Sequence, residues 1–364
     1  MRTADRKLVL ADGSEYYGYG FGGREDRVCE LVFDTSMVGY QEIVTDPAYA
    51  DQAVLMTYPL IGNYGITDDD SESKAPALGA LIVHDYHDMP SNFRATKSLA
   101  ELLEENGIPG LYGLDTRQLT RALRDRGSCP ALITDADTPL AQALETLRTT
   151  PLRRDAVARV SCKKRWYART ANHVCHVVAI DCGIRLSSIR CLNRLGCNVT
   201  VVPYDTVPAD IAFMKPDGIF LSDGPGDPAD VPAVAETIRA LRGTVPMFGV
   251  GLGHQLLALS YGAKASKLPV GHRGANHAVR CLTTGRLETV AQNHGYAVDE
   301  ASLVGTGLTV THRDLMDSTV EGLACPADRA FSAQYHPESV FDPQNADDLF
   351  VRFRDLMKEA KTNA

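Results

Sequence analysis

Hydrophobic and polar residues follow two different rhythms along the chain, one in the N-terminal part and another in the C-terminal part. In the N-terminal part, short alternating runs bounded by Gly, Asp and Pro predict strands, and two stretches with helical spacing predict helices. The strands are predicted at residues 7–10, 30–33 and 53–57, and the helices at residues 98–106 and 117–126. Asp115 and Thr116, which precede the second helix, are residue types that cap helix N-termini. This part therefore predicts a compact mixed α/β domain.

From residue 176 onward, apolar β-branched runs alternate with helical stretches at a regular interval. The strands are predicted at residues 177–180, 198–202, 218–221 and 245–250, with one helix running through residues 193–196 and another at 233–242. This alternation indicates an α/β domain with a doubly wound, mostly parallel sheet. Such sheets place their ligand sites at the carboxyl ends of the strands. We therefore expect residues 181–183, 222–227 and 249–253 to converge at one edge.

A basic, polar stretch separates the two parts. It follows a helical run that opens near residue 136, and it carries the cations Arg153, Arg154, Lys163, Lys164 and Arg165. We predict an N-terminal domain at residues 1–150, a linker at 151–174 and a second domain at 175–362. An exposed helix and loop of the first domain is the alternative interpretation of the stretch.

The amino-acid composition limits the class of protein and the compartment that can be expected. A chain of 364 residues is too long for one ordinary core, and 44% hydrophobic with 23% charged residues is typical of a soluble globular protein. A net charge of -9 argues against a nucleic-acid surface. Nine scattered cysteines without a C-x-x-C pair favour reduced thiols in a cytoplasm. The polar N-terminus and the absence of a long apolar run predict neither a signal peptide nor a membrane span.

Residues 246–259 combine an apolar run, a glycine-rich turn and a helix-like run. The pattern is typical of a nucleophile elbow, whose backbone N–H groups after the tip form an oxyanion hole. A Cys or Ser is expected at the tip, where this chain has Gly251. A dinucleotide loop of the form G-x-G-x-x-G is excluded because position 254 is His. A structural strand–turn–helix without chemistry is the alternative.

His336 and Glu338 stand two residues apart in the segment Gln-Tyr-His-Pro-Glu. Side chains two apart on a short strand share one face of the sheet. His336 could then serve as a general base whose ring is oriented by Glu338. A structural histidine beside a proline is the alternative. With the elbow, the pair supplies the frame of a covalent catalyst that lacks its nucleophile.

Two further features are less specific. Four histidines in the C-terminal half have a spacing that matches no metal-binding signature, so no metal site is predicted for His272, His277, His294 and His312. Residues 293–296, Asn-His-Gly-Tyr, are predicted to form either a hairpin turn or a ligand contact.

Taken together, these segments resemble the small, glutamine-binding subunits of carbamoyl phosphate synthetase over nearly the whole chain. In the first domain the resemblance rests on residues 34–42, 57–65 and 114–117. In the second domain it rests on residues 222–228, 253–255, 271–277, 292–295 and 334–338. The resemblance implies a class I, triad-type glutamine amidotransferase fold for the second domain. The N-terminal domain separates this family from other amidotransferases.

In the family, a cysteine at the elbow attacks the side-chain amide of glutamine to form a γ-glutamyl thioester, and ammonia passes to the large subunit. The resemblance implies Gly251 in the place of that cysteine, His336 as the base and Glu338 as its orienter. It implies a glutamine pocket formed by Ser36, Gly224, Gly226, Leu252, Gln255, Asn293, Gly295 and Tyr296. Asp223 stands where the family commonly has Asn, and Tyr296 where it usually has Phe.

The resemblance also implies the partners. These are L-glutamine and a large subunit that makes carbamoyl phosphate from bicarbonate for arginine and pyrimidine biosynthesis, with ATP and Mg²⁺ bound there and no cofactor in this chain. Gly251 implies impaired glutamine hydrolysis, and Cys182, which ends an adjacent predicted strand, is the nearest substitute nucleophile by topology.

Several alternatives are open. The chain could be a non-catalytic structural or regulatory partner of an ammonia-using large subunit. An amidotransferase for anthranilate or GMP synthesis is disfavoured by the N-terminal domain. Gly251 could be natural, an engineered change that traps glutamine, or a sequence error.

Overall fold

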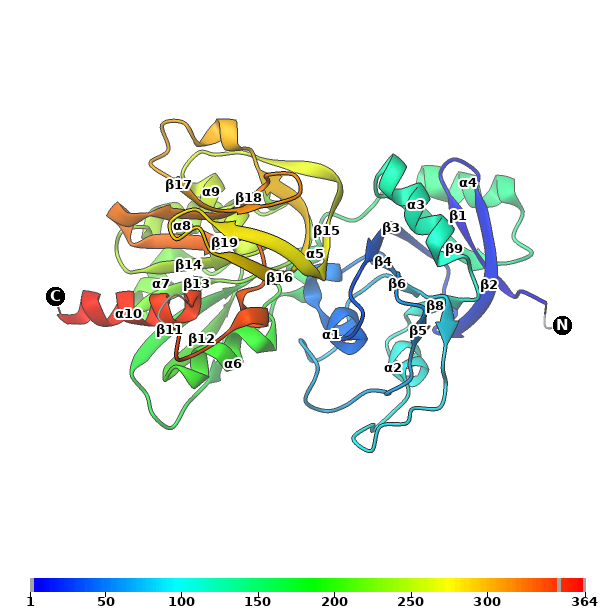
Figure 1. The fold of residues 1–364 in the computed structure, drawn as a ribbon, viewed down its shortest axis with the longest axis horizontal. Helices are drawn as coiled ribbons and strands as arrows, with labels where there is room; N and C mark the ends of the chain where they lie inside the picture. Colours follow the sequence, from blue (N-terminus) through cyan, green and yellow to red (C-terminus); the bar gives the residue numbers. More distant parts are fainter. Residues whose placement is uncertain (1–2, 346–347, 363–364) are drawn as a thin grey trace. The chain divides into compact units, whose positions relative to one another are not determined.

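The computed structural model describes residues 3–345 and 348–362, and the chain divides into two compact units (Figure 1). Unit 1 is Met1–Arg154 and unit 2 is Asp155–Ala364. The segment predicted as a linker, residues 151–174, contains α5 (Ala156–Val160) and β10 (Trp166–Ala168), which both belong to unit 2. Within the described ranges, no helix is both long and apolar enough to cross a membrane.

Unit 1 is built around a closed barrel with the strand order β1-β2-β8-β6-β4-β3-β9. Its strands are β1 (Arg6–Leu10), β2 (Glu15–Gly22), β3 (Arg27–Asp34), β4 (Gln52–Met56), β6 (Ala80–Ile82), β8 (Pro109–Tyr112) and β9 (Cys129–Asp135), and a small separate sheet pairs β5 (Leu60–Ile61) with β7 (Asp85–Tyr86). Its helices are α1 (Tyr40–Thr45), α2 (Leu99–Glu105), α3 (Thr116–Arg126) and α4 (Leu140–Thr149), with one 3-10 turn, η1 (Pro47–Tyr49). The three strands and two helices predicted for this part are confirmed.

Local signals explain the helix starts and the core of unit 1. Asp115 caps α3, because its carboxylate accepts the backbone N–H of Gln118 at 2.8 Å. α3 packs Leu119 and Leu123 into one buried cluster with barrel residues that include Leu31 and Leu55. The amphipathic pattern of α3 is therefore matched by the barrel side that it covers.

Unit 2 contains a ten-stranded sheet in the order β10-β12-β11-β13-β14-β19-β18-β17-β15-β16. The strands are β11 (Cys175–Asp181), β12 (Cys197–Pro203), β13 (Gly218–Leu221), β14 (Met247–Val250), β15 (Ala265–Cys281), β16 (Leu287–Val298), β17 (Thr309–Asp314), β18 (Val320–Cys325) and β19 (Ala330–Ala333). The five central strands, from β12 to β19, pair in parallel, and the strands outside them pair antiparallel.

Helices cover both faces of this sheet, which confirms the predicted doubly wound α/β fold. Val178 and Ile180 of β11 belong to one buried cluster, and Val177 and Ala179 belong to another, because successive side chains of a strand point to opposite faces. The first cluster includes residues of α7 (Pro208–Phe213), α8 (Pro232–Leu241) and α9 (Leu252–Ser260). The second includes residues of α6 (Leu186–Arg194) and α10 (Leu349–Thr362). Four 3-10 turns complete unit 2: η2 (Pro228–Asp230), η3 (Glu300–Leu303), η4 (Pro326–Asp328) and η5 (Pro337–Val340).

An aromatic cluster anchors the middle of the sheet. Phe248 of β14 stacks on Phe331 of β19 with ring centroids 4.6 Å apart, and it meets Phe350 of α10 edge to face at 5.4 Å. All three side chains are buried. This packing holds together β14 and β19, the two strands that lead into the candidate site.

Candidate active site at the ends of strands β13, β14 and β19

Three adjacent parallel strands bring the candidate residues to one edge of the sheet. Leu221 of β13 pairs with Gly249 of β14, and Val250 of β14 pairs with Ala333 of β19. The chain segments that leave these strands carry Asp223, Gly251 and His336. Parallel register therefore gathers residues that are more than a hundred positions apart in the sequence.

The elbow has the strand–turn–helix form that its sequence predicts. Gly251 alone separates β14 from α9, with φ 55° and ψ -114°, a conformation that side-chain-bearing L residues rarely adopt. Its backbone N–H donates to the carbonyl of Ala333 at 3.0 Å. A β-carbon on Gly249 would lie 2.6 Å from the carbonyl oxygen of Gly253, so the helix crosses the strand too closely for a side chain there.

The carboxylate of Asp223 lies over the tip of the elbow. Its Oδ1 accepts the backbone N–H of Leu252 at 2.9 Å and that of Gly224 at 2.7 Å. Leu252 directly follows the tip, so its N–H is an expected donor of an oxyanion hole. The side chain of Asp223 is 4% exposed, so these hydrogen bonds are shielded from water.

His336 lies beside this carboxylate and is buried. Its Nδ1 is 3.7 Å from Oδ2 of Asp223, and within the described part of the chain neither ring nitrogen has a hydrogen-bond partner. Its backbone N–H donates to the carbonyl of Ala291 at 2.9 Å, which fixes the residue against β16. Burial, reinforced by Arg185 and His294, holds the pKa of His336 well below 6.5. The imidazole is therefore neutral at physiological pH.

Glu338 contacts a different partner from the one that the sequence suggests. Its Oε1 accepts the hydroxyl of Ser188 on α6, and His336 makes no hydrogen bond to it. The expectation of a short strand at this point is wrong, because residues Pro337–Val340 form the 3-10 turn η5. Proline at the first position of the turn favours this geometry, and the side chains of residues 336 and 338 do not share a strand face.

The residues predicted to form the glutamine pocket occupy several places. Gln255 of α9 donates from Nε2 to the carbonyl of Tyr296 and to Oε1 of Gln334, both at 2.9 Å. This joins α9 to β16, which also carries Asn293 and Gly295. Of the two alternatives for residues 293–296, the hairpin turn is wrong, because these residues lie inside β16 where it pairs with β15; the ligand contact stays a prediction.

Three other pocket residues lie in loops. Gly224 contributes its N–H to Asp223, whereas Gly226 is exposed in the same loop with φ 88°. Ser36 belongs to unit 1, where its backbone N–H donates to Oδ1 of Asp34 at 2.6 Å. Gly224 and Leu252 therefore meet at the Asp223 carboxylate, and Gln255 meets Tyr296.

Cys182, the topological substitute for a nucleophile, is buried at the end of β11. Burial, with the nearby carboxylates of Asp181 and Asp223, raises the pKa of its thiol. Its backbone N–H donates to the hydroxyl of Ser222 at 2.9 Å. A buried neutral thiol is a poor nucleophile.

The structure brings together a histidine cluster that sequence spacing did not reveal. His272 of β15 stands opposite His294 of β16, and both lie 3.7 Å from Oε1 of the buried Glu321 on β18. Burial lowers the pKa of His272, but Glu321 and Asp317 together raise it to about 9. A protonated His272 therefore balances the charge of its neighbours.

The other two histidines lie in different surroundings. His277 stacks on His272 with ring centroids 5.3 Å apart, whereas the ring of His312 packs against Tyr335. Cross-strand pairing, which sequence spacing does not report, makes this cluster.

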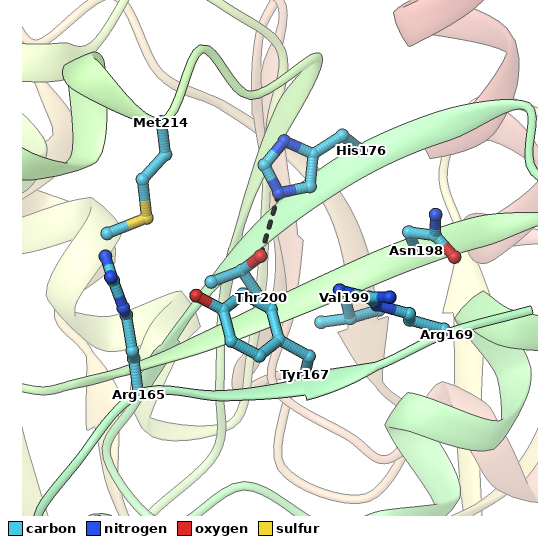
Figure 2. A pocket seen from close by; sticks show the side chains of 8 residues that line it. All are labelled: Arg165, Tyr167, Arg169, His176, Asn198, Val199, Thr200 and Met214. Atoms are coloured by element: carbon cyan, nitrogen blue, oxygen red, sulfur yellow. Dashed lines mark hydrogen bonds between the residues drawn. The ribbon is translucent and has the colours of Figure 1, made fainter.

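A separate pocket of about 420 Å³ lies along β10, β11 and β12 (Figure 2). Figure 2 shows His176 hydrogen bonded through Nε2 to Thr200 at 2.9 Å, with Arg165 and Met214 on one side. Arg165 and Arg169 make the lining basic. The pocket shares no lining residue with the elbow, so it is separate from the candidate active site.

The comparisons with known proteins match this architecture in both halves of the chain. Residues 8–133 match the family model described as "Carbamoyl-phosphate synthase small chain, CPSase domain". Residues 178–356 match "Glutamine amidotransferase class-I". The doubly wound sheet with its elbow therefore defines the C-terminal half as a class I glutamine amidotransferase domain.

Full-length relatives identify the family. The chain is 47% identical over 359 residues to the carbamoyl phosphate synthase pyrimidine-specific small chain of Halalkalibacterium halodurans, covering 99% of both chains. It is 48% identical to the carbamoyl phosphate synthase small chain of Staphylococcus epidermidis over 98% of this chain and 97% of that one. It is 47% identical to the small chain of Bacillus cereus with the same coverage. The chain belongs to the carbamoyl phosphate synthase small chain family.

Proposed function

We propose that this chain is the amidotransferase-type subunit of a carbamoyl phosphate synthase whose own hydrolysis of glutamine is impaired. The observation that carries the proposal is the tip of the elbow. Gly251 directly precedes Leu252, whose N–H donates to the carboxyl group beside the buried His336, and it offers no side chain to attack a carbonyl carbon. Loss of a triad nucleophile typically lowers the rate of hydrolysis by several orders of magnitude.

The partner and the nitrogen source follow from this proposal. A large subunit would bind ATP and Mg²⁺ and make carbamoyl phosphate from bicarbonate, using free ammonium because this chain releases little ammonia from glutamine. The product would serve arginine and pyrimidine biosynthesis in the cytoplasm. The nine free cysteines support a reducing compartment.

The residues of the glutamine site keep the roles that the sequence predicts for them. His336 would act as the base and Glu338 as a group that orients it after rearrangement away from Ser188. Within unit 2 the pocket would be lined by Gly224, Gly226, Leu252, Gln255, Asn293, Gly295 and Tyr296. In this proposal the chain needs no metal or cofactor of its own.

The test is carbamoyl phosphate synthesis by the full chain together with the large subunit of its own organism. One assay supplies glutamine and the other supplies ammonium at the same nitrogen concentration. We expect synthesis with ammonium and less than about 1% of that rate with glutamine. Comparable rates with glutamine would show that another nucleophile or a water-based route operates, and would overturn the proposal.

A second candidate function is favoured by the Asp223 carboxylate that occupies the backbone N–H donors at the tip. The chain would then be a non-catalytic partner that stabilises or regulates an ammonia-using large subunit. It predicts that adding this chain changes the thermal stability or effector response of the large subunit. Glutamine would have no effect in that assay.

A further inference from the structure

The side chain of Asp223 uses both backbone donors that a glutamine carbonyl would need. The N–H groups of Leu252 and Gly224 converge on the same oxygen, Oδ1, at 2.9 Å and 2.7 Å. They come from two different segments, one after β14 and one after β13, as in an oxyanion hole built from the elbow and a neighbouring loop. An oxygen that already accepts both N–H groups leaves neither donor for a glutamine carbonyl, which would have to displace it.

The same carboxylate also uses the space above the elbow. A β-carbon built on Gly251 would lie less than 3.0 Å from Oδ1, Oδ2 and Cγ of Asp223. Real β-carbons essentially never show such distances, so a side chain at position 251 and the observed placement of Asp223 exclude each other. Gly251 is thus the residue that permits the carboxylate to reach the two N–H groups.

The surroundings of the carboxylate do not favour its release. His336 is its neighbour at 3.7 Å and is neutral, because burial lowers the pKa of the imidazole well below 6.5. Moving Asp223 out would break two hydrogen bonds in a site where both side chains are nearly inaccessible to water. Leaving buried N–H donors without a partner is destabilising, because they have lost their hydrogen bonds to water and gain no others.

We propose that Asp223 is a built-in occupant of the oxyanion hole, which excludes the side-chain amide of glutamine from the reactive position and couples the loss of hydrolysis to two residues, Gly251 and Asp223. The inference rests on the proposed function, because it concerns the same glutamine site. It goes further, since it states that restoring a thiol at the elbow is not enough to restore hydrolysis.

The first experiment measures glutamine affinity, and it leaves the elbow unchanged. Calorimetric titration of the full chain compares wild type, Asp223→Ala and Asp223→Asn. Removing the carboxylate frees both N–H groups, so we expect Asp223→Ala to bind glutamine at least about 10-fold more tightly than wild type. Asp223→Asn, which keeps an uncharged acceptor of the same shape, should lie between them. Equal affinities of wild type and Asp223→Ala would overturn the inference.

The second experiment measures ammonia release from glutamine by the full chain paired with its large subunit. It compares Gly251→Cys with the double variant Gly251→Cys/Asp223→Ala, and uses Asp223→Ala as the matched control without a thiol. We expect the double variant to exceed Gly251→Cys by about 100-fold in kcat/KM, because alanine removes both the acceptor at the two N–H groups and the clash with a β-carbon at position 251. Equal activity of the single and double thiol variants would overturn the inference.

The two proposals fail in different ways. Ammonium-dependent synthesis by the wild-type complex tests only the proposed function. If that synthesis is absent while Asp223→Ala still binds glutamine more tightly, the proposed function is wrong and the role of Asp223 stands. If the complex makes carbamoyl phosphate with ammonium, and the Asp223 variants bind glutamine with the same affinity as wild type, the inference is wrong and the proposed function stands.

Discussion

The carboxylate of Asp223 fills the space that a side chain at Gly251 would need. A β-carbon at position 251 would lie 2.9 Å from Oδ2 and closer still to Oδ1, which already accepts the N–H of Leu252. The two residues follow neighbouring parallel strands, so the conflict is set by the register of the sheet. Any account of chemistry at this elbow must therefore treat the two positions together.

A stability cycle tests this steric coupling. We expect Gly251→Ala to lower the free energy of unfolding by about 2–4 kcal/mol, because it adds both backbone strain at positive φ and a clash with Asp223. In an Asp223→Ala background the same change should cost about 1–3 kcal/mol less, as measured by urea unfolding. Gly262→Ala is the matched control, since Gly262 has φ 92° and no atom within 4 Å of a built β-carbon. Additive effects of the two changes would show that the side chains do not compete.

The aromatic core beneath the elbow should be sensitive to truncation. Phe248 is fully buried and contacts the rings of Phe331 and Phe350. We expect Phe248→Ala to lower the free energy of unfolding by about 3–5 kcal/mol through lost packing and a cavity. Phe213→Ala, at a ring that is 87% exposed, should change it by less than about 0.5 kcal/mol in the same urea titration. If the two variants lost similar amounts of unfolding free energy, the aromatic cluster would not be what anchors β14.

The histidine cluster should make stability depend on pH. Burial lowers the pKa of His272, but Glu321 and Asp317 raise it overall from 6.5 to about 9. A raised pKa means that the folded state holds the proton more tightly. Its contribution, on the order of 3 kcal/mol, is fully present below pH 6.5 and is lost as the pH rises through 9.

Burial raises the pKa of Glu321 to about 7, against the lowering by His272, so this residue also favours the protonated folded state. Urea unfolding of wild type and His272→Gln at pH 6 and pH 9.5 measures the effect. We expect a large difference in stability at pH 6 that shrinks at pH 9.5, with His87→Gln as a control at an exposed histidine. A difference that does not change with pH would rule out titration of His272 as its source.

The cysteines should differ in reactivity. Burial raises the pKa of Cys182, whereas Cys281 is half-buried and hydrogen bonds from Thr283 and Thr284 outweigh burial and lower its pKa. We expect iodoacetamide to label Cys281 at least about 100-fold faster than Cys182 at pH 7.5, as read by peptide mass spectrometry. The peptide that contains Cys182 should also carry no γ-glutamyl adduct after incubation with glutamine. Rapid labelling or an adduct at Cys182 would make it a candidate nucleophile.

The central sheet could be predicted from the sequence because its strands are continuous apolar runs. The strand at residues 218–221 has the bounds of β13, and the elbow follows β14 as expected. The long pair β15 and β16 was missed. Buried, half-exposed and exposed positions are mixed along both strands, and register shifts between Lys267 and His272 and between Gly274 and His277 break the alternation that marks a strand.

The sequence pattern predicts residues for the candidate site but not the contacts that these residues make. Gly251, His336 and Leu252 are located by the sequence pattern, whereas the hydrogen bonds of Asp223 depend on the register of β13 and β14. The contact of Glu338 with Ser188 depends on α6, which is 150 residues away in the sequence. Tertiary packing sets the direction of the side chains at these positions, so the hydrophobic pattern of the sequence does not predict it.

The glycine at the tip has a consequence for the history of the site. On the proposed function, a single codon change that returns a thiol to position 251 meets the Asp223 carboxylate, and a single change at 223 gains no thiol. Two substitutions rather than one would therefore separate this chain from the use of glutamine.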